Sequence, residues 1–108
     1  MRQPDDDALA LDRLVHEPAR LAIMTVLSSV ADADFLFLQN ATGLTKGNLS
    51  SHLSRLEEAG LVRITKQIVR KRTLTTVALT PVGEERIARH WAQLDRLRSA
   101  ARPRPRRP

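Results

Sequence analysis

Between residues 45 and 60, leucines recur at a helical spacing and small polar or basic residues occupy the other positions. Leu49, Leu53 and Leu56 are four and three residues apart, the pattern of a helix that buries one face. The opposite face can enter a DNA major groove about 12 Å wide, where asparagine pairs with adenine and arginine or lysine with guanine. We therefore expect the following residues to contact DNA: Thr45, Lys46, Gly47, Asn48, Ser50, Ser51, Ser54 and Arg55.

A second cluster consists of three consecutive cations, Arg70, Lys71 and Arg72. They lie between two segments rich in β-formers, residues 61–68 and 73–79, which we expect to pair as a hairpin. Cations at the tip of such a hairpin can contact DNA phosphates or enter a minor groove, where the potential is most negative.

Each cluster also has a simpler interpretation. A polar helix face can merely contact solvent, and consecutive charges at a hairpin can protect a strand edge from pairing with other chains. Because the helix and the hairpin follow one another in the chain, we favour DNA binding by both.

Residue types suited to catalysis or metal binding do not form a recognisable pattern. Cysteine is absent, and His16, His52 and His90 lack the spacing of a zinc site. His52 lies beside the leucines, and we expect it to pack there rather than to bind a ligand. The sequence shows no nucleophile and base pair and no glycine-rich phosphate loop. We therefore expect a protein that is not an enzyme and has no cofactor or metal site.

Size and charge agree with a small DNA-binding domain. The 108 residues suit one domain, and 18 basic against 12 acidic side chains give a net charge of +6. Residues 1–34 carry three basic and seven acidic side chains, whereas residues 35–80 carry seven and two. The basic part favours a polyanionic partner. The chain has only two aromatic side chains besides Trp91, namely Phe35 and Phe37. They are too few for the bases of a single strand to stack on, so duplex DNA fits better.

The sequence also bears on location. The first residues, MRQPDDD, are acidic where a signal peptide would be basic. No uncharged run is longer than residues 21–31, well short of the roughly 20 residues that span a membrane. We expect a cytoplasmic protein without membrane association.

Capping residues and apolar spacing predict the elements before the leucine-bearing helix. Acidic caps precede a short helix over residues 8–16, and Pro18 starts a second helix whose apolar residues reach Val30. Residues 35–41 are expected to begin extended and to continue as a helix that ends before Gly43.

The second half of the chain is predicted in the same way. Thr45 and Gly60 are suited to cap the two ends of the leucine-bearing helix. From Leu61 the apolar period changes to two, which places Val62, Ile64 and Ile68 on one face of a strand. The turn at residues 70–72 contains no glycine, asparagine or aspartate, so its type is open. Thr80 and Pro81 then start a last helix.

The order of helix, short turn, capped helix and β-hairpin is that of a winged helix-turn-helix. The run Leu44–Val62, with Leu11–Ile23, Phe35–Leu38 and Leu79–Gly83, resembles small MarR/ArsR-like transcriptional regulators with a winged helix DNA-binding domain. The resemblance covers residues 11–95. It implies an α+β fold, mainly helical with a β-hairpin wing and a C-terminal dimerisation helix, and a homodimer that binds operator DNA.

The wing departs from the pattern of the family at three positions. Arg70 stands where glycine is usual, Thr73 where proline often occurs, and Val77 where an aromatic residue is common. These departures concern the shape of the wing rather than DNA binding.

An apolar stripe on the last helix predicts the dimer interface. A domain this small cannot easily cover the stripe alone, although packing on its own core is the alternative. We expect a homodimer that forms through the terminal helices, with Leu11, Leu14, Ile87, Trp91, Leu94 and Leu97 in the interface.

The sequence thus predicts a sequence-specific regulator of transcription that binds double-stranded DNA as a homodimer. Residues 1–101 would form the winged helix-turn-helix domain and residues 102–108 a basic disordered tail. The alternative is an architectural winged-helix module, or one that binds protein or RNA, because a fold does not determine a function. A preference of about 10³-fold or more for one duplex over random DNA would distinguish a regulator.

Overall fold

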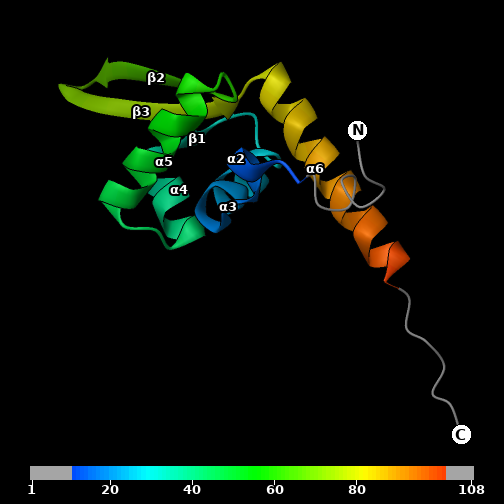
Figure 1. The fold of residues 1–108 in the computed structure, drawn as a ribbon. Helices are drawn as coiled ribbons and strands as arrows, with labels where there is room; N and C mark the ends of the chain where they lie inside the picture. Colours follow the sequence, from blue (N-terminus) through cyan, green and yellow to red (C-terminus); the bar gives the residue numbers. More distant parts are fainter. Residues whose placement is uncertain (1–10, 102–108) are drawn as a thin grey trace, which may run out of the picture.

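The computed structural model describes residues 11–101 (Figure 1). The expected basic tail and residues 8–10 of the first expected helix lie outside this range. No helix within the described range is both long and apolar enough to cross a membrane. The elements are the helices α2 (Arg13–His16), α3 (Pro18–Leu27), α4 (Phe35–Thr42), α5 (Lys46–Glu58) and α6 (Pro81–Ala100), and the strands β1 (Ala33–Asp34), β2 (Val62–Val69) and β3 (Arg72–Leu79).

The predicted ends of α5 and the start of α6 are confirmed. Thr45 Oγ1 accepts a hydrogen bond from the backbone N–H of Asn48 at 3.2 Å and so caps α5. Thr80 Oγ1 accepts from the N–H of Gly83 at 3.0 Å and caps α6. Gly60, just after α5, has a φ of 77°, a left-handed conformation that glycine adopts without strain.

The first helix starts later than expected within the described range. Leu11 and Asp12 are not helical, and α2 begins at Arg13. The reason is that Asp12 is its N-cap, with Oδ1 accepting from the backbone N–H of Leu14 at 3.2 Å.

Two further boundaries differ from the prediction. The second helix, α3, ends at Leu27 and does not reach Val30. Just after it, Ser28 Oγ donates a hydrogen bond to a carbonyl oxygen of the last helical turn. Val30 is exposed beyond it. The chain is extended before Phe35 rather than from it, because Asp34 caps α4 and makes Phe35 its first residue.

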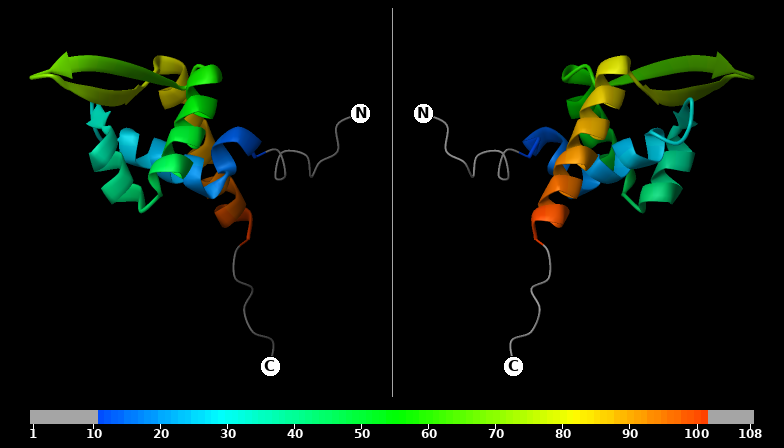
Figure 2. Two further views of the ribbon diagram at one scale, coloured as in Figure 1. Left: turned by 90° about the vertical axis from the view of Figure 1, so that its left-hand side faces the viewer. Right: turned by 90° about the vertical axis from the view of Figure 1, so that its right-hand side faces the viewer.

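The sheet has three antiparallel strands in the order β1-β3-β2. In the wing, which is the hairpin of β2 and β3, Val62 pairs with Leu79 and Ile68 with Thr73, so the predicted alternation holds. Burial falls along the wing. Val62 is buried in the core, whereas Ile68 is 82% exposed because the hairpin projects past the helices (Figure 2).

The turn of the wing consists of Arg70 and Lys71, with φ values of 51° and 65°. Left-handed backbone at both positions is the pattern of a type I′ turn, whose twist matches that of the flanking strands. Neither residue is a glycine or asparagine, so the turn carries backbone strain. Arg72, which we expected in the turn, is instead the first residue of β3 and pairs with Val69.

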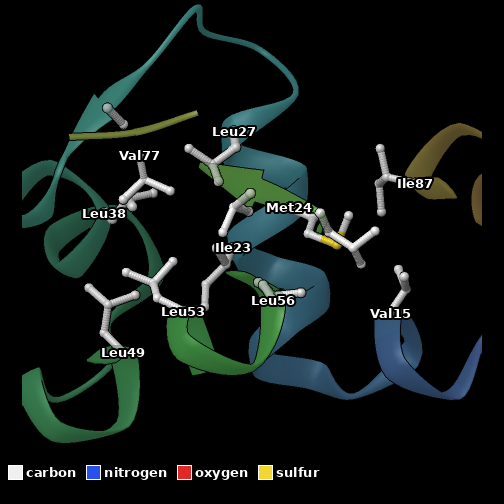
Figure 3. Close-up of a cluster of buried hydrophobic side chains, with 13 residues drawn as sticks. Val15, Ile23, Met24, Leu27, Leu38, Leu49, Leu53, Leu56, Val77 and Ile87 are labelled. Atoms are coloured by element: carbon white, nitrogen blue, oxygen red, sulfur yellow. The ribbon is translucent and has the colours of Figure 1, made fainter. Parts of the chain in front are cut away.

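The core lies between α3, α5 and one face of the sheet, and α2 and α6 close its far end (Figure 3). The three leucines predicted to form the buried face of α5 all point into it. Burial of these apolar side chains is the main force that fixes which face of α5 remains outside. The fully buried side chains include Val15, Ile23, Met24, Leu27, Leu38, Leu49, Leu56, Leu61, Val77 and Ile87.

Candidate nucleic-acid interface

All the residues of α5 that we expected to contact DNA lie on its exposed side, together with its N-cap. Thr45 uses its hydroxyl oxygen to cap the helix. Among the described residues, the side chains of Asn48, Ser51 and Arg55 have no hydrogen-bond or ion-pair partner, so their donors and acceptors are available to a ligand. We call this surface the reading face of α5, and it consists of Lys46, Gly47, Asn48, Ser50, Ser51, Ser54 and Arg55.

A groove of about 790 Å³ separates the reading face from the wing. Three cations line it, Lys46 from α5 and Lys66 and Arg72 from the wing. Its one acidic side chain, Asp34, already accepts a hydrogen bond from the backbone N–H of Phe37 at 2.7 Å. Six apolar side chains also line the groove. Its charged side chains are positive overall, which suits the phosphate backbone of a duplex that contacts α5 on one side and the wing on the other. Hydroxyl groups of Ser50, Ser54, Thr73 and Thr75 also line it.

Lys66 was not among the predicted site residues. The signal for it was present in the alternation of β2, because Lys66 lies two residues after Ile64 and so shares its face of the strand. That face turns toward α5, and Lys66 is the cation on it, between Ile64 and Ile68.

The basic tip of the wing lies away from the helices (Figure 2). Arg70, Lys71 and Arg72 are all exposed, and within residues 11–101 none of them has an ion-pair partner. Because α5 and the wing tip lie on either side of the groove, both clusters can contact one duplex.

The side chains expected in a dimer interface do not share one environment. Ile87 is only 1% exposed and belongs to the core of the protomer, so it is not available to a partner chain. Leu14 also packs against the core, and Leu11 is half-buried. Trp91 is 37% exposed. Leu94 and Leu97, both partly exposed, lie on the half of α6 that extends beyond the other helices (Figure 1).

Polar contacts join α2 to α6. Arg86 Nε donates to Asp12 Oδ2 at 2.8 Å, and its Nη2 donates to Oδ1 at 2.9 Å, a bidentate ion pair. One turn further along both helices, His16 Nδ1 and His90 Nε2 lie 3.1 Å apart. The helix that bears the expected interface is therefore fixed to the start of the domain by directional contacts.

His90 is fully buried, and its Nδ1 has no partner among the described residues. Donation from its Nε2–H to His16 leaves Nδ1 as an unpaired acceptor, which costs less than an unpaired N–H. Burial, reinforced by the neighbouring His16, lowers the pKa of His90 below its usual value, although Asp12 acts in the opposite direction. The described residues contain no group of three His, Asp or Glu side chains placed to hold a metal ion.

Comparison with known proteins agrees with this arrangement. Residues 19–98 match the sequence model of a family described as winged helix DNA-binding domain. An uncharacterized protein of Methanocaldococcus jannaschii, MJ0432, is 31% identical over 71 residues, which are 66% of this chain and 77% of that protein.

Solved structures show the same fold. A transcriptional regulator homologue from Pyrococcus horikoshii OT3 is 32% identical and superposes with a TM-score of 0.82, over 91% of this chain and 97% of that one. A MarR family transcriptional regulator from Silicibacter pomeroyi is 26% identical, with a TM-score of 0.60, over 92% of this chain and 65% of that one. These proteins are regulators of transcription and not enzymes. The chain belongs to the winged helix DNA-binding domain family, and MarR-family transcriptional regulators are among its structural neighbours.

Proposed function

We propose that this protein is a cytoplasmic regulator of transcription that binds a specific double-stranded DNA site as a homodimer. The observation that supports it most is the reading face of α5, whose unpaired polar side chains adjoin a positively charged groove and a basic wing. The side chains of the face are small around Gly47 and Ser51, which lets the helix backbone approach base edges. Asn48, Ser51 and Arg55 would read bases, and the wing would contact phosphates or a minor groove.

The homodimer is supported by α6. Its second half extends beyond the core, and Trp91, Leu94 and Leu97 are apolar or aromatic side chains that the protomer leaves partly exposed. Aromatic side chains of this kind commonly anchor interfaces. A symmetric pair would place its two reading faces in successive major grooves, about 34 Å apart, and would therefore select a site with two related halves.

Selection of bound duplexes from a random pool tests this function. A regulator should enrich a symmetric site and bind it about 10³-fold or more tightly than random duplex at the same salt concentration. Binding of all duplexes with equal affinity would instead indicate an architectural protein. A preference for RNA or for a protein partner would contradict the proposed function. Sedimentation of the free protein checks the dimer separately.

A further inference from the structure

A buried arginine lies where α2 meets α3. Arg20 is 9% exposed, and its Nε donates to the carbonyl oxygen of Leu14 at 2.6 Å. Its own backbone N–H donates to Glu17 Oε2 at 2.9 Å, which caps α3. A guanidinium in a protein is always charged, so this arginine is costly to bury and needs partners in a fixed geometry.

One of these partners is on α5. Arg20 Nη1 lies 3.3 Å from Nδ1 of His52, and Glu17 Oε2 lies 3.6 Å from the same nitrogen and 3.9 Å from Arg20 Nη1. Because a guanidinium only donates, the contact assigns Nδ1 of His52 as an acceptor and its ring proton to Nε2. We expected His52 to be a simple packing residue, but it is the polar link between α5 and the α2–α3 junction.

Glu17, the third side chain in these contacts, is ionised in the folded protein. Burial acts to raise the pKa of Glu17, but hydrogen bonds from the N–H groups of Arg20 and Ala19, together with nearby positive charge, outweigh it, and its pKa is lowered. Glu17 is thus a carboxylate at neutral pH beside a guanidinium.

His52 occupies a particular place in α5. It is 21% exposed in its side chain and follows Ser51 directly. Asn48 precedes it by four residues and Arg55 follows by three, so all three proposed base readers lie within one turn of it. The buried leucines of α5 fix which of its faces is covered, but apolar packing is not directional. The hydrogen bond from Arg20 to His52 adds a directional contact to this packing.

We propose that Glu17, Arg20 and His52 form a positioning cluster that adjusts the rotation and axial place of α5 within the limits set by its buried leucines, and thereby the preference of the protein for its DNA site. This inference rests on the proposed function, because it concerns how the reading face meets base edges. Base contacts need a defined geometry, whereas phosphate contacts of mobile lysines and arginines tolerate small shifts of a helix. The cluster therefore affects discrimination more than total affinity.

Substitution of His52 tests the cluster without removing the buried arginine. His52→Leu removes the acceptor and keeps an apolar body of similar size, while His52→Asn keeps an acceptor near the position of Nδ1. We expect His52→Leu to lose about tenfold or more of the preference for the selected duplex over random duplex, the scale of one base contact that is no longer well placed. Affinity for random duplex should change less than about twofold. His52→Asn should retain most of the preference.

Thermal unfolding and amide hydrogen exchange of the same variants distinguish positioning from stability. A positioning role predicts faster exchange or shifted amide signals along α5 in His52→Leu, with α6 and the wing unchanged, and recovery in His52→Asn. Equal losses on both duplexes, or failure of His52→Asn to recover either property, would overturn the cluster.

Different results would refute the proposed function and the positioning cluster. If the unsubstituted protein shows no site preference, the proposed function is wrong, and the positioning cluster is then tested only by the amide signals of α5. Amide signals of α5 that are the same in His52→Leu and in the unsubstituted protein would refute it.

Discussion

Gly83, in the first turn of α6, lies directly against the backbone carbonyl of Leu61, and a Cβ at Gly83 would collide with that oxygen. The backbone N–H of Thr80 donates to the same carbonyl at 3.0 Å, and Thr80 Oγ1 donates to the carbonyl of Gly60 at 2.6 Å. The start of α6 is thus joined to the point where the chain leaves α5 and enters the wing. The relative placement of the reading face, the wing and α6 depends on this contact.

Gly83→Ala should destabilise the fold, because the new methyl group meets backbone that cannot move aside. We expect a loss of about 1–3 kcal/mol in the free energy of unfolding, measured by denaturant titration. Gly47→Ala is the matched control. Gly47 is also helical, but nothing lies within 4 Å of the position of its Cβ, so alanine should stabilise by up to about 1 kcal/mol. Equal effects of both substitutions would contradict the close contact.

Stability should fall as the pH is lowered through the histidine range, because of His90. Its folded pKa is lowered from the ordinary value of 6.5 by burial, so below that pH the unfolded chain binds a proton that the folded chain does not. The contribution of His90 to the free energy of unfolding is constant above its ordinary pKa. It decreases as the pH falls from there to the folded pKa. Urea unfolding at several pH values between about 5 and 8 measures this slope.

The variant His90→Leu removes the titrating group from the core, and we expect the slope in this range to flatten. His16→Asn keeps the buried imidazole and should retain most of the slope. If His90→Leu shows the same pH dependence as the unsubstituted protein, another group is responsible.

The turn of the wing should be more stable with asparagine at position 70 and glycine at position 71. The double variant Arg70→Asn, Lys71→Gly adopts the left-handed φ values with less strain, and we expect a gain of about 1 kcal/mol in the free energy of unfolding. DNA binding should change in the opposite sense, since two cations are lost. The slope of log affinity against log salt should decrease by about 0.9 for each phosphate contact removed.

A salt series on a duplex with an A-tract and one without it separates two modes for the wing. Phosphate contacts lower affinity for both duplexes equally, whereas insertion into a minor groove weakens the A-tract duplex more. A double variant that matches the unsubstituted protein in slope and affinity on both duplexes would show that the tip does not touch DNA.

The double variant Trp91→Ala, Leu94→Ala should be monomeric at concentrations where the unsubstituted protein is dimeric, because it removes the aromatic anchor and a neighbouring apolar side chain from α6. Sedimentation measures the change. Val82→Ala serves as the control, since Val82 is exposed on the first turn of the same helix and lies outside the proposed interface. A dimer that survives the double substitution would refute this interface.

Features of the structure that depend on residues close together in the sequence were predictable, whereas features that depend on distant residues were not. Thr45 and Gly60 act on backbone within three residues, and the ends of α5 were therefore predictable. The turn at Arg70 and Lys71 was left open, because its type comes from the pairing of two strands and not from the preference of either residue.

Contacts between distant parts of the chain were not predictable. Ile87 belongs to the apolar stripe of α6, but periodicity does not tell which member of a stripe packs on its own core. Arg20 and His52 are 32 residues apart, and only the packing of α5 against α3 brings them together.

The most direct test of the base-reading role of α5 is the affinity of Arg55→Ala and of the unsubstituted protein for a series of duplexes, each altered at one position of the selected site. If Arg55 reads a base, the variant should lose about 1–3 kcal/mol of binding free energy on the selected site and become indifferent to one position while discriminating at the others. Uniform weakening on every duplex, random DNA included, would show that Arg55 contacts only the backbone. The same result for Asn48→Ala and Ser51→Ala would contradict base reading by this helix.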